Sequence, residues 1–234
     1  MRLFGRLDIL SDMPSLPSRC APFHPRPLLA PPRNETLKIF GLIESERPGL
    51  HIFLHGALNV GKSTAISKTL DILTTMRPLK IGGFMSWRSK DNDRHVVFIR
   101  PAMPGREHEK YLLAVYYPYN RSIDCDPRIF DKLCTRLLEE NPDADFIVMD
   151  ELGFLERRSF IFQQAVLSAI NGDIPIIGVL RSGNIPWHKS IKSSPRVSLC
   201  EITLENRDAL PRELAARLTP FVDSGKPPHG GFLS

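Results

Sequence analysis

Residues 56–64 read GALNVGKST and combine glycines, a lysine and hydroxyls at a spacing that binds phosphate. They match the pattern GxxxxGK[ST] through Gly56, Gly61, Lys62 and Ser63. In this pattern the glycines let backbone N–H groups turn toward phosphate oxygens, the lysine reaches the β- and γ-phosphates, and the serine hydroxyl is a magnesium ligand. The stretch therefore predicts a loop that holds a triphosphate together with Mg²⁺.

The sequence on either side of this loop fits the same interpretation. The apolar run LHIFLH occupies residues 50–55, and residues 65–76 repeat apolar side chains at helical spacing. A strand that leads through a glycine turn into a helix brings the positive end of the helix dipole to the phosphate. This context disfavours the alternative, an ordinary glycine-rich turn with a surface lysine.

A second element of such a site is an acid at the end of a buried strand, where it can hold magnesium. Residues 145–150, DFIVMD, are a buried-type strand that ends in Asp150, and Glu151 follows at once. Ligands of open α/β sheets bind at the carboxyl ends of the strands, so the two acids fit a magnesium anchor and a base for the attacking water. The alternative is a solvated turn, because acids often end strands.

The elements that must position these residues alternate along the chain. We expect buried-type strands at 50–55, 145–150, 174–180 and 196–204, and helices at 65–76, 128–140, 159–170 and 205–218. Three further strand-like runs at 82–87, 95–101 and 110–117 form a small strand-rich insertion. Apolar strands that alternate with helices predict the α/β class, with a mostly parallel central sheet covered by helices on both faces.

Length and composition predict one globular domain with tails. The chain has 234 residues, of which 42% are hydrophobic, and prolines crowd residues 14–32. We expect a flexible, proline-rich leader over 1–47, a P-loop domain over 48–220 and a flexible tail over 221–234.

The charge balance and the apolar runs bear on location and partners. The net charge of +5 arises from 31 basic and 26 acidic residues, which favours phosphate ligands more than nucleic acid. No apolar run reaches the roughly 18 residues of a membrane helix. We therefore expect a cytoplasmic protein with no role for a membrane, whose partner is a nucleoside triphosphate such as ATP or GTP, and nucleic acid is a disfavoured partner.

Three stretches besides the phosphate loop carry a recognisable pattern, namely IGGFMS (81–86), MDELGFLERRSFIF (149–162) and LENRDALPREL (204–214). With the loop, this ordered set resembles the small P-loop nucleoside-triphosphatases of the thermophile type. The resemblance extends over roughly residues 50–219. It implies Mg²⁺-dependent hydrolysis of ATP, GTP and other nucleoside triphosphates.

The resemblance also implies particular residues. Magnesium ligation falls to Ser63 and Asp150, and Lys62 and Glu151 are the catalytic residues, Glu151 as the base. The nucleotide-binding residues that it implies are Gly56, Ala57, Leu58, Asn59, Val60, Gly61, Lys62, Ser63, Thr64, Asn206 and Arg207.

Two departures from the family pattern bear on rate. Phe154 stands where the family has a lysine, so a cation that stabilises transition-state charge is missing from that position. Ser86-Trp87-Arg88 replaces an acid followed by an arginine, and Arg88 could substitute. These departures predict slow hydrolysis, or dependence on an activating protein partner that supplies a cation.

Other functions of the same loop remain open at this point. A nucleotide or small-metabolite kinase is the main alternative, with Arg100 and Arg106 in an arginine-containing lid, although a solvated hairpin loop is the favoured interpretation of that segment. A GTPase switch is disfavoured, because DELG matches Asp-x-x-Gly but no Asn-Lys-x-Asp is present to read guanine. Arg157 and Arg158 are interpreted as a solvated helix start rather than arginine fingers.

Overall fold

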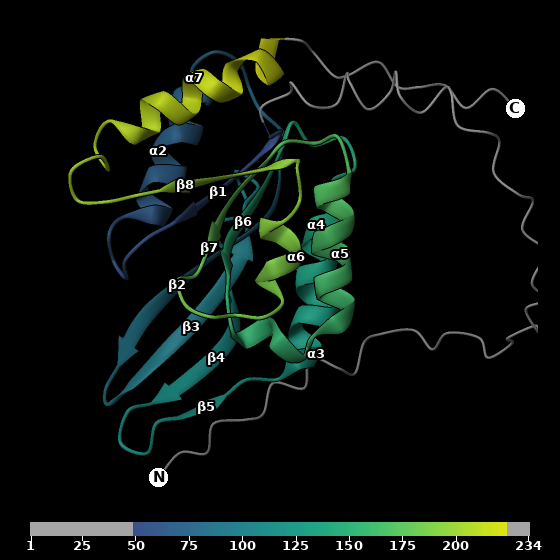
Figure 1. Ribbon diagram of the computed structural model, residues 1–234. Coiled ribbons are helices and arrows are strands. Elements are labelled where there is room, and N and C mark those ends of the chain that lie inside the picture. Colours follow the sequence, from purple (N-terminus) through teal and green to yellow (C-terminus); the bar gives the residue numbers. More distant parts are fainter. Residues whose placement is uncertain (1–48, 224–234) are drawn as a thin grey trace, which may run out of the picture. The chain divides into compact units, whose positions relative to one another are not determined.

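The computed structural model describes residues 49–223, and these residues form an eight-stranded sheet in the order β5-β4-β3-β2-β6-β7-β1-β8 (Figure 1). The strands are β1 (His51–His55), β2 (Ile81–Asp91), β3 (Arg94–Pro101), β4 (Tyr111–Tyr117), β5 (Ser122–Asp124), β6 (Phe146–Leu152), β7 (Ile176–Leu180) and β8 (Val197–Glu201). Neighbours among β2, β6, β7, β1 and β8 are parallel, whereas β3, β4 and β5 extend the sheet in antiparallel pairs. The predicted α/β class with a mostly parallel sheet and a strand-rich insertion is confirmed.

Strand β2 belongs to both parts of the sheet. Its first half, Ile81–Met85, pairs in parallel with β6, and its second half runs on beside β3 alone. The burial of its side chains changes at the same point, from buried to exposed. Residues just beyond Met85 therefore lie next to the carboxyl end of β6, where the two acids are.

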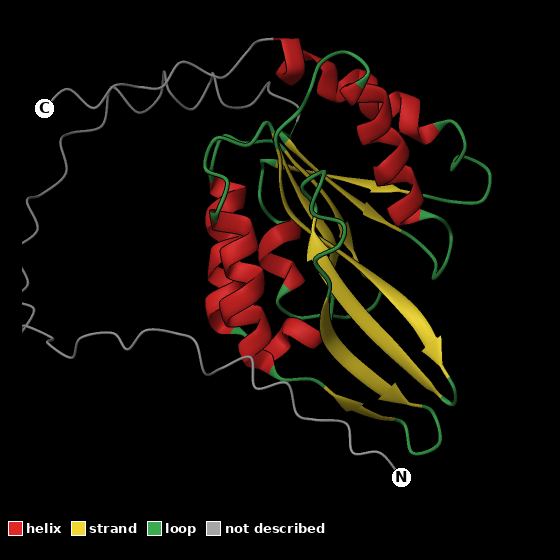
Figure 2. Ribbon diagram, turned by 180° about the vertical axis from the view of Figure 1, so that it is seen from behind, coloured by secondary structure: helices red, strands yellow, loops and turns green. Residues whose placement is uncertain are grey.

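Helices cover both faces of the sheet (Figure 2). On one face α2 (Lys62–Thr74) packs with α7 (Leu210–Asp223). The other face carries α3 (Pro127–Ile129), the π-helical turn η2 (Phe130–Cys134), α4 (Thr135–Glu139), α5 (Phe160–Asn171) and α6 (His188–Lys192). Strand β1 shows why two layers are needed: Ile52 and Leu54 enter the first core and Phe53 the second, because successive side chains alternate across a strand.

Three expectations differ from the structure in detail. The helix expected at 128–140 is divided by the π-helical turn, and the helix expected at 205–218 begins only at Leu210. Residues before Leu210 form turns because the Asn206 side chain accepts from Thr203 N at 2.8 Å and donates to Glu201 O at 2.9 Å. Strand β5 was not expected, since its three exposed residues carry no apolar pattern.

The domain boundaries lie close to the ends of the described residues. Helix α7 continues to Asp223, beyond the expected domain end at 220. The proline-rich leader and the rest of the tail lie outside the described residues. Within the described part of the chain, no helix is long and apolar enough to cross a membrane.

Candidate active site

The phosphate loop joins β1 to α2 and depends on two glycines. Gly56 has φ of 146°, and a Cβ there would lie 2.4 Å from the carbonyl oxygen of Ile202. Gly61 has φ of 110° and forms the N-cap of α2, whose first-turn N–H groups open toward the loop. Asn59, at φ of 59°, is the residue type that best tolerates this left-handed backbone after glycine. The loop thus has the curvature that turns backbone N–H groups toward an anion.

Lys62 lies across the inside of this loop. Its ammonium donates to Ala57 O at 2.6 Å and to Gly56 O at 3.1 Å. Burial lowers the pKa of Lys62, while the nearby carboxylates of Glu151 and Asp150 oppose that shift. Ser182, just after β7, donates its hydroxyl to Gly56 O at 2.6 Å and fixes the loop from the neighbouring strand.

Asp150 is a buried carboxylate with spare capacity to bind a cation. Its side chain lies at the end of β6 and is 2% exposed, and its Oδ2 has no hydrogen-bond partner among the described residues. Burial raises the pKa of Asp150 to about 7, and the hydroxyl of Ser63, which donates to it, opposes the shift. A carboxylate and a hydroxyl are oxygen ligands of the kind Mg²⁺ prefers. The two residues therefore fit the metal that the sequence implies.

The protein ligands that Asp150 and Ser63 offer to a metal are few. Among the described residues, no group of three or more His, Cys, Asp or Glu side chains could hold a metal ion. Mg²⁺ commonly uses one or two protein oxygens and takes its other ligands from phosphate and water. Two oxygen donors, one from Asp150 and one from Ser63, match this usual coordination of Mg²⁺.

Glu151 lies between two arginines. Arg181 Nη1 is 2.8 Å from Glu151 Oε1, and Arg88 Nη2 is 3.5 Å from the same oxygen. The backbone N–H of Glu151 donates to the hydroxyl of Ser86 at 3.3 Å. Arg88 reaches the acid because β2 pairs with β6 up to Met85 and then runs past it.

A cleft of about 820 Å³ brings these groups together. Of the predicted residues, its wall includes Leu58, Asn59, Gly61, Lys62, Ser63, Thr64, Asp150 and Glu151. Gly56 and Ala57 do not line the cleft, but their carbonyl oxygens accept from Lys62, and Val60 packs in the core. Arg88, Phe154 and Arg181 complete the wall beside the acids.

Asn206 and Arg207 lie in the turn after β8, apart from this wall. The amide of Asn206 is occupied within its own turn, and Arg207 is exposed. The chain just before this turn lies beside the start of the phosphate loop, since Ile202 N donates at 2.9 Å to the carbonyl oxygen of His55, the residue before Gly56. A nucleotide-binding role for these two residues stays a prediction.

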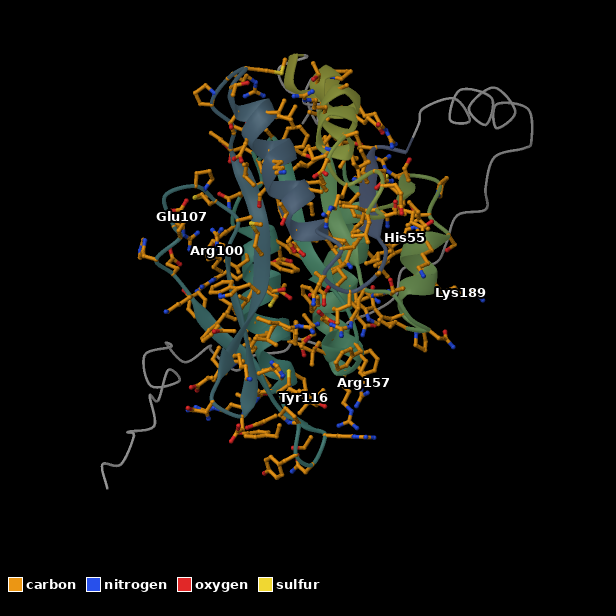
Figure 3. All side chains as sticks on the ribbon, turned by 90° about the vertical axis from the view of Figure 1, so that its left-hand side faces the viewer. His55, Arg100, Glu107, Tyr116, Arg157 and Lys189 are labelled. Atoms are coloured by element: carbon orange, nitrogen blue, oxygen red, sulfur yellow. The ribbon has the colours of Figure 1, made fainter. Side chains whose placement is uncertain are left out.

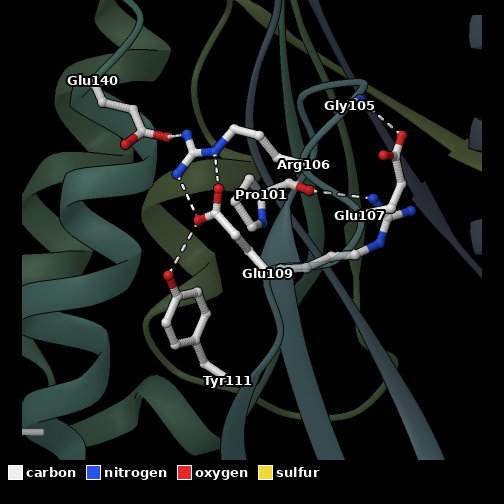
Figure 4. Close-up of polar contacts among 8 residues, drawn as sticks. Pro101, Gly105, Arg106, Glu107, Glu109, Tyr111 and Glu140 are labelled. Atoms are coloured by element: carbon white, nitrogen blue, oxygen red, sulfur yellow. Dashed lines mark hydrogen bonds and ion pairs between the residues drawn. The ribbon is translucent and has the colours of Figure 1, made fainter.

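Arg100 and Arg106, which were weighed as parts of a lid and interpreted instead as a hairpin loop, form contacts away from the cleft. Arg106 forms ion pairs with Glu109 and with Glu140, the C-cap residue of α4, and Tyr111 donates to Glu109 at 3.1 Å (Figure 4). Arg100 donates to Pro101 O at 3.3 Å. This network ties the β3–β4 hairpin loop to α4, and neither arginine is among the described residues that line the cleft.

Arg157 and Arg158 are exposed at the start of the segment that leads into α5, and Arg157 projects from the surface (Figure 3). Neither lines the cleft. Their interpretation as a solvated segment agrees with this placement, although they lie in the 3₁₀ turn η3 (Leu155–Arg158).

Sequence reasoning missed three residues of this site. Arg181 and Ser182 directly follow the buried strand β7, so the rule that selected Asp150, a polar side chain at a strand's carboxyl end, would have found them. Glu156 is 3% exposed and accepts from Gly153 N at 3.0 Å. A buried acid has no marker in a single sequence, because exposed acids of the same spacing are far more common.

A glycine-containing loop between a strand and a helix, opposite an acid near the carboxyl end of a parallel strand, defines this chain as a P-loop nucleoside-triphosphatase in fold and site. The particular family follows from the sequence. A family model described as NTPase matches residues 51–215, so the chain belongs to this NTPase family and to the nucleoside-triphosphatase class of enzymes.

Individual relatives agree with this assignment. The chain is 28% identical over 185 residues to nucleoside-triphosphatase THEP1 of Thermofilum pendens, covering 74% of this chain and 97% of the relative. It is 26% identical over 170 residues to the protein of that name from Methanosarcina barkeri, covering 72% and 97%. The crystal structure of THEP1 from Aquifex aeolicus has the same fold, with a TM-score of 0.56 at 21% identity over 72% of this chain and 98% of that one.

Proposed function

We propose that this protein hydrolyses nucleoside triphosphates, ATP and GTP among them, to the diphosphate and phosphate with Mg²⁺ as cofactor. The observation that carries the proposal is the buried carboxylate of Asp150, which lines the same cleft as Ser63 and Lys62 and has one oxygen without a hydrogen-bond partner among the described residues. Relatives named nucleoside-triphosphatase support the reaction class.

Binding falls to the loop. The N–H groups at the start of α2 and the ammonium of Lys62 bind the β- and γ-phosphates. On binding, the phosphate oxygens replace Gly56 O and Ala57 O as the partners of Lys62. Ser63 and Asp150 would hold Mg²⁺, which would supply positive charge beside the phosphates. Little covalent chemistry is then required, because positioning supplies much of the acceleration.

Glu151 orients the attacking water and accepts its proton. The water oxygen forms a bond to the γ-phosphorus, the bond from that phosphorus to the bridging oxygen breaks, and the diphosphate leaves. The contacts to Arg181 and Arg88 place the Glu151 carboxylate on the cleft wall, one residue from the magnesium ligand Asp150.

A kinase remains the second candidate for one specific reason. The cleft continues past Glu151 along β3 and β4 to His95 and Tyr116, which leaves room for an acceptor beyond the phosphate loop. A kinase would release the diphosphate only when an acceptor is present. An activating protein partner, a cytoplasmic location and the physiological nucleotide remain predictions.

The test is phosphate release from ATP, GTP and CTP without an acceptor, in Mg²⁺ and in EDTA. We expect release that depends on Mg²⁺ and falls about 100-fold or more in Lys62→Ala. Lys68→Ala is the matched control, because Lys68 is an exposed lysine of the same helix. Release that persists in EDTA, or an equal rate in Lys62→Ala, would overturn the proposal, and release only on addition of an acceptor would favour the kinase.

A further inference from the structure

Arg181 is held at the cleft by three contacts from the carboxyl end of β6. Its backbone N–H donates to Leu152 O at 2.9 Å, its Nη1 lies 2.8 Å from Glu151 Oε1, and its guanidinium carbon is 4.9 Å from the centroid of the Phe154 ring. A guanidinium over an aromatic face is attracted by the ring and needs little further ordering when it binds an anion. The side chain is therefore positioned before any ligand arrives.

The residue between these contacts makes room for the arginine. A Cβ at Gly153 would lie 3.3 Å from Arg181 Cδ, closer than side chains normally pack. The glycine lets the aliphatic part of Arg181 cross the end of β6 and reach both Glu151 and Phe154. The Gly153 backbone is itself fixed, since Trp187 Nε1 donates to its carbonyl oxygen at 2.9 Å.

The charges around Glu151 would allow Arg181 to exchange its carboxylate partner for a phosphate. Both Arg181 and Arg88 contact the same oxygen of Glu151, so one carboxylate faces two cations. A γ-phosphate carries more negative charge than a carboxylate and offers guanidinium a paired set of oxygens. Arg181 is the better placed of the two, because its contact is shorter, its side chain is 26% exposed against 42% for Arg88, and it alone has the aromatic support.

We propose that Arg181 is a further catalytic residue, which turns from Glu151 to the γ-phosphate when a nucleoside triphosphate binds. Its cation then stabilises the charge that develops on the transferred phosphoryl group, and Glu151 is released to accept the proton of water. Phe154 keeps the guanidinium beside the cleft during this exchange. The chain thereby supplies in itself the cation that the sequence lacks at position 154. The inference rests on the proposed hydrolysis.

The first test compares Arg181→Met with Arg157→Ala in phosphate release. Methionine keeps a flexible apolar stem over Gly153, and Arg157 is an exposed arginine of the next turn outside the cleft. We expect kcat to fall about 100-fold in Arg181→Met and to stay unchanged in Arg157→Ala. Free guanidinium in the assay should restore part of the lost rate, which no loss of folding would produce.

Binding gives a second readout that does not depend on turnover. A nucleoside diphosphate lacks the γ-phosphate, so calorimetry with a non-hydrolysable triphosphate analogue and with the diphosphate isolates the contact. The native chain should prefer the analogue, and Arg181→Met should lose about tenfold of that preference. Arg157→Ala should keep it.

A charge relocation completes the test. In the native chain Arg181 lies over the ring of Phe154. Phe154→Lys in the Arg181→Met background therefore moves the cation from position 181 to its neighbour, position 154, and should recover part of the activity. An active native enzyme with an unchanged kcat and an unchanged triphosphate preference in Arg181→Met would overturn the role of Arg181. The result that would refute the proposed hydrolysis is distinct from this one, because the native chain would then release no phosphate and Lys62→Ala would change nothing.

Discussion

Replacing Glu156 with glutamine should change how stability depends on pH. Glu156 is 3% exposed, and burial raises its pKa to about 7 from 4.5. Because the folded-state pKa lies above the unfolded one, this group's contribution is fully present below pH 4.5 and is lost as pH rises through 7. Glutamine keeps a carbonyl acceptor for Gly153 N and does not ionise.

The magnitude follows from the two pKa values. The interval from 4.5 to about 7, at 1.36 kcal/mol per pH unit, corresponds to about 3 kcal/mol. The native chain should therefore lose about 3 kcal/mol of unfolding free energy relative to Glu156→Gln between pH 4.5 and 8. Groups that are the same in both proteins, Asp150 included, cancel in this difference.

Urea unfolding followed by tryptophan fluorescence at a series of pH values measures this difference. Glu139→Gln is the control, because Glu139 is an exposed acid of α4, and its curve should parallel that of the native chain. Parallel curves for Glu156→Gln and the native chain would refute the assignment of a buried carboxyl with a raised pKa.

Further substitutions test other parts of the structure. Gly56→Ala brings a Cβ within 2.4 Å of Ile202 O and should lower both the melting temperature and nucleotide affinity, whereas Gly105→Ala, with nothing within 4 Å, should cost only about 1 kcal/mol for its positive φ. Asp150→Asn removes a buried charge, so calorimetry should detect loss of the Mg²⁺-dependent part of nucleotide binding while stability at pH 8 does not fall. Phe162→Ala empties a fully buried site against two phenylalanines and should cost about 3–5 kcal/mol in urea unfolding; a cost below 1 kcal/mol would contradict the packing.

The sequence predicted those parts of the fold that depend on local pattern. Strands such as residues 145–150 can be recognised in the sequence because burial on both faces gives them a continuous apolar run. The glycine loop can be recognised because each of its fixed positions has a chemical reason. The start of α7 at Leu210 was not predicted, because the turn before it depends on the Asn206 side chain, which donates to Glu201 O at the end of β8 and accepts from Thr203 N.

In the site, too, residues marked by a local pattern were predicted, and contacts between distant segments were not. Asp150 and Glu151 were found from their place at a strand end, but the two arginines on Glu151 come from other strands, and their meeting depends on the sheet order β2-β6-β7. Phe154 was interpreted from sequence as a lost cation. In the structure its ring lies under the guanidinium of Arg181, a contact between segments that no spacing in the sequence reveals.

The proposed hydrolysis requires that Glu151 acts on water in a cleft where Lys62 binds the nucleotide and Asp150 binds Mg²⁺. Rapid-quench measurement of ATP cleavage in Mg²⁺, with ATP binding measured on the same samples, tests it directly in the native chain, Glu151→Gln and the control Glu139→Gln. We expect Glu151→Gln to bind ATP and to cleave it about 100-fold or more slowly, while Glu139→Gln matches the native chain. Cleavage by Glu151→Gln at the native rate would contradict it.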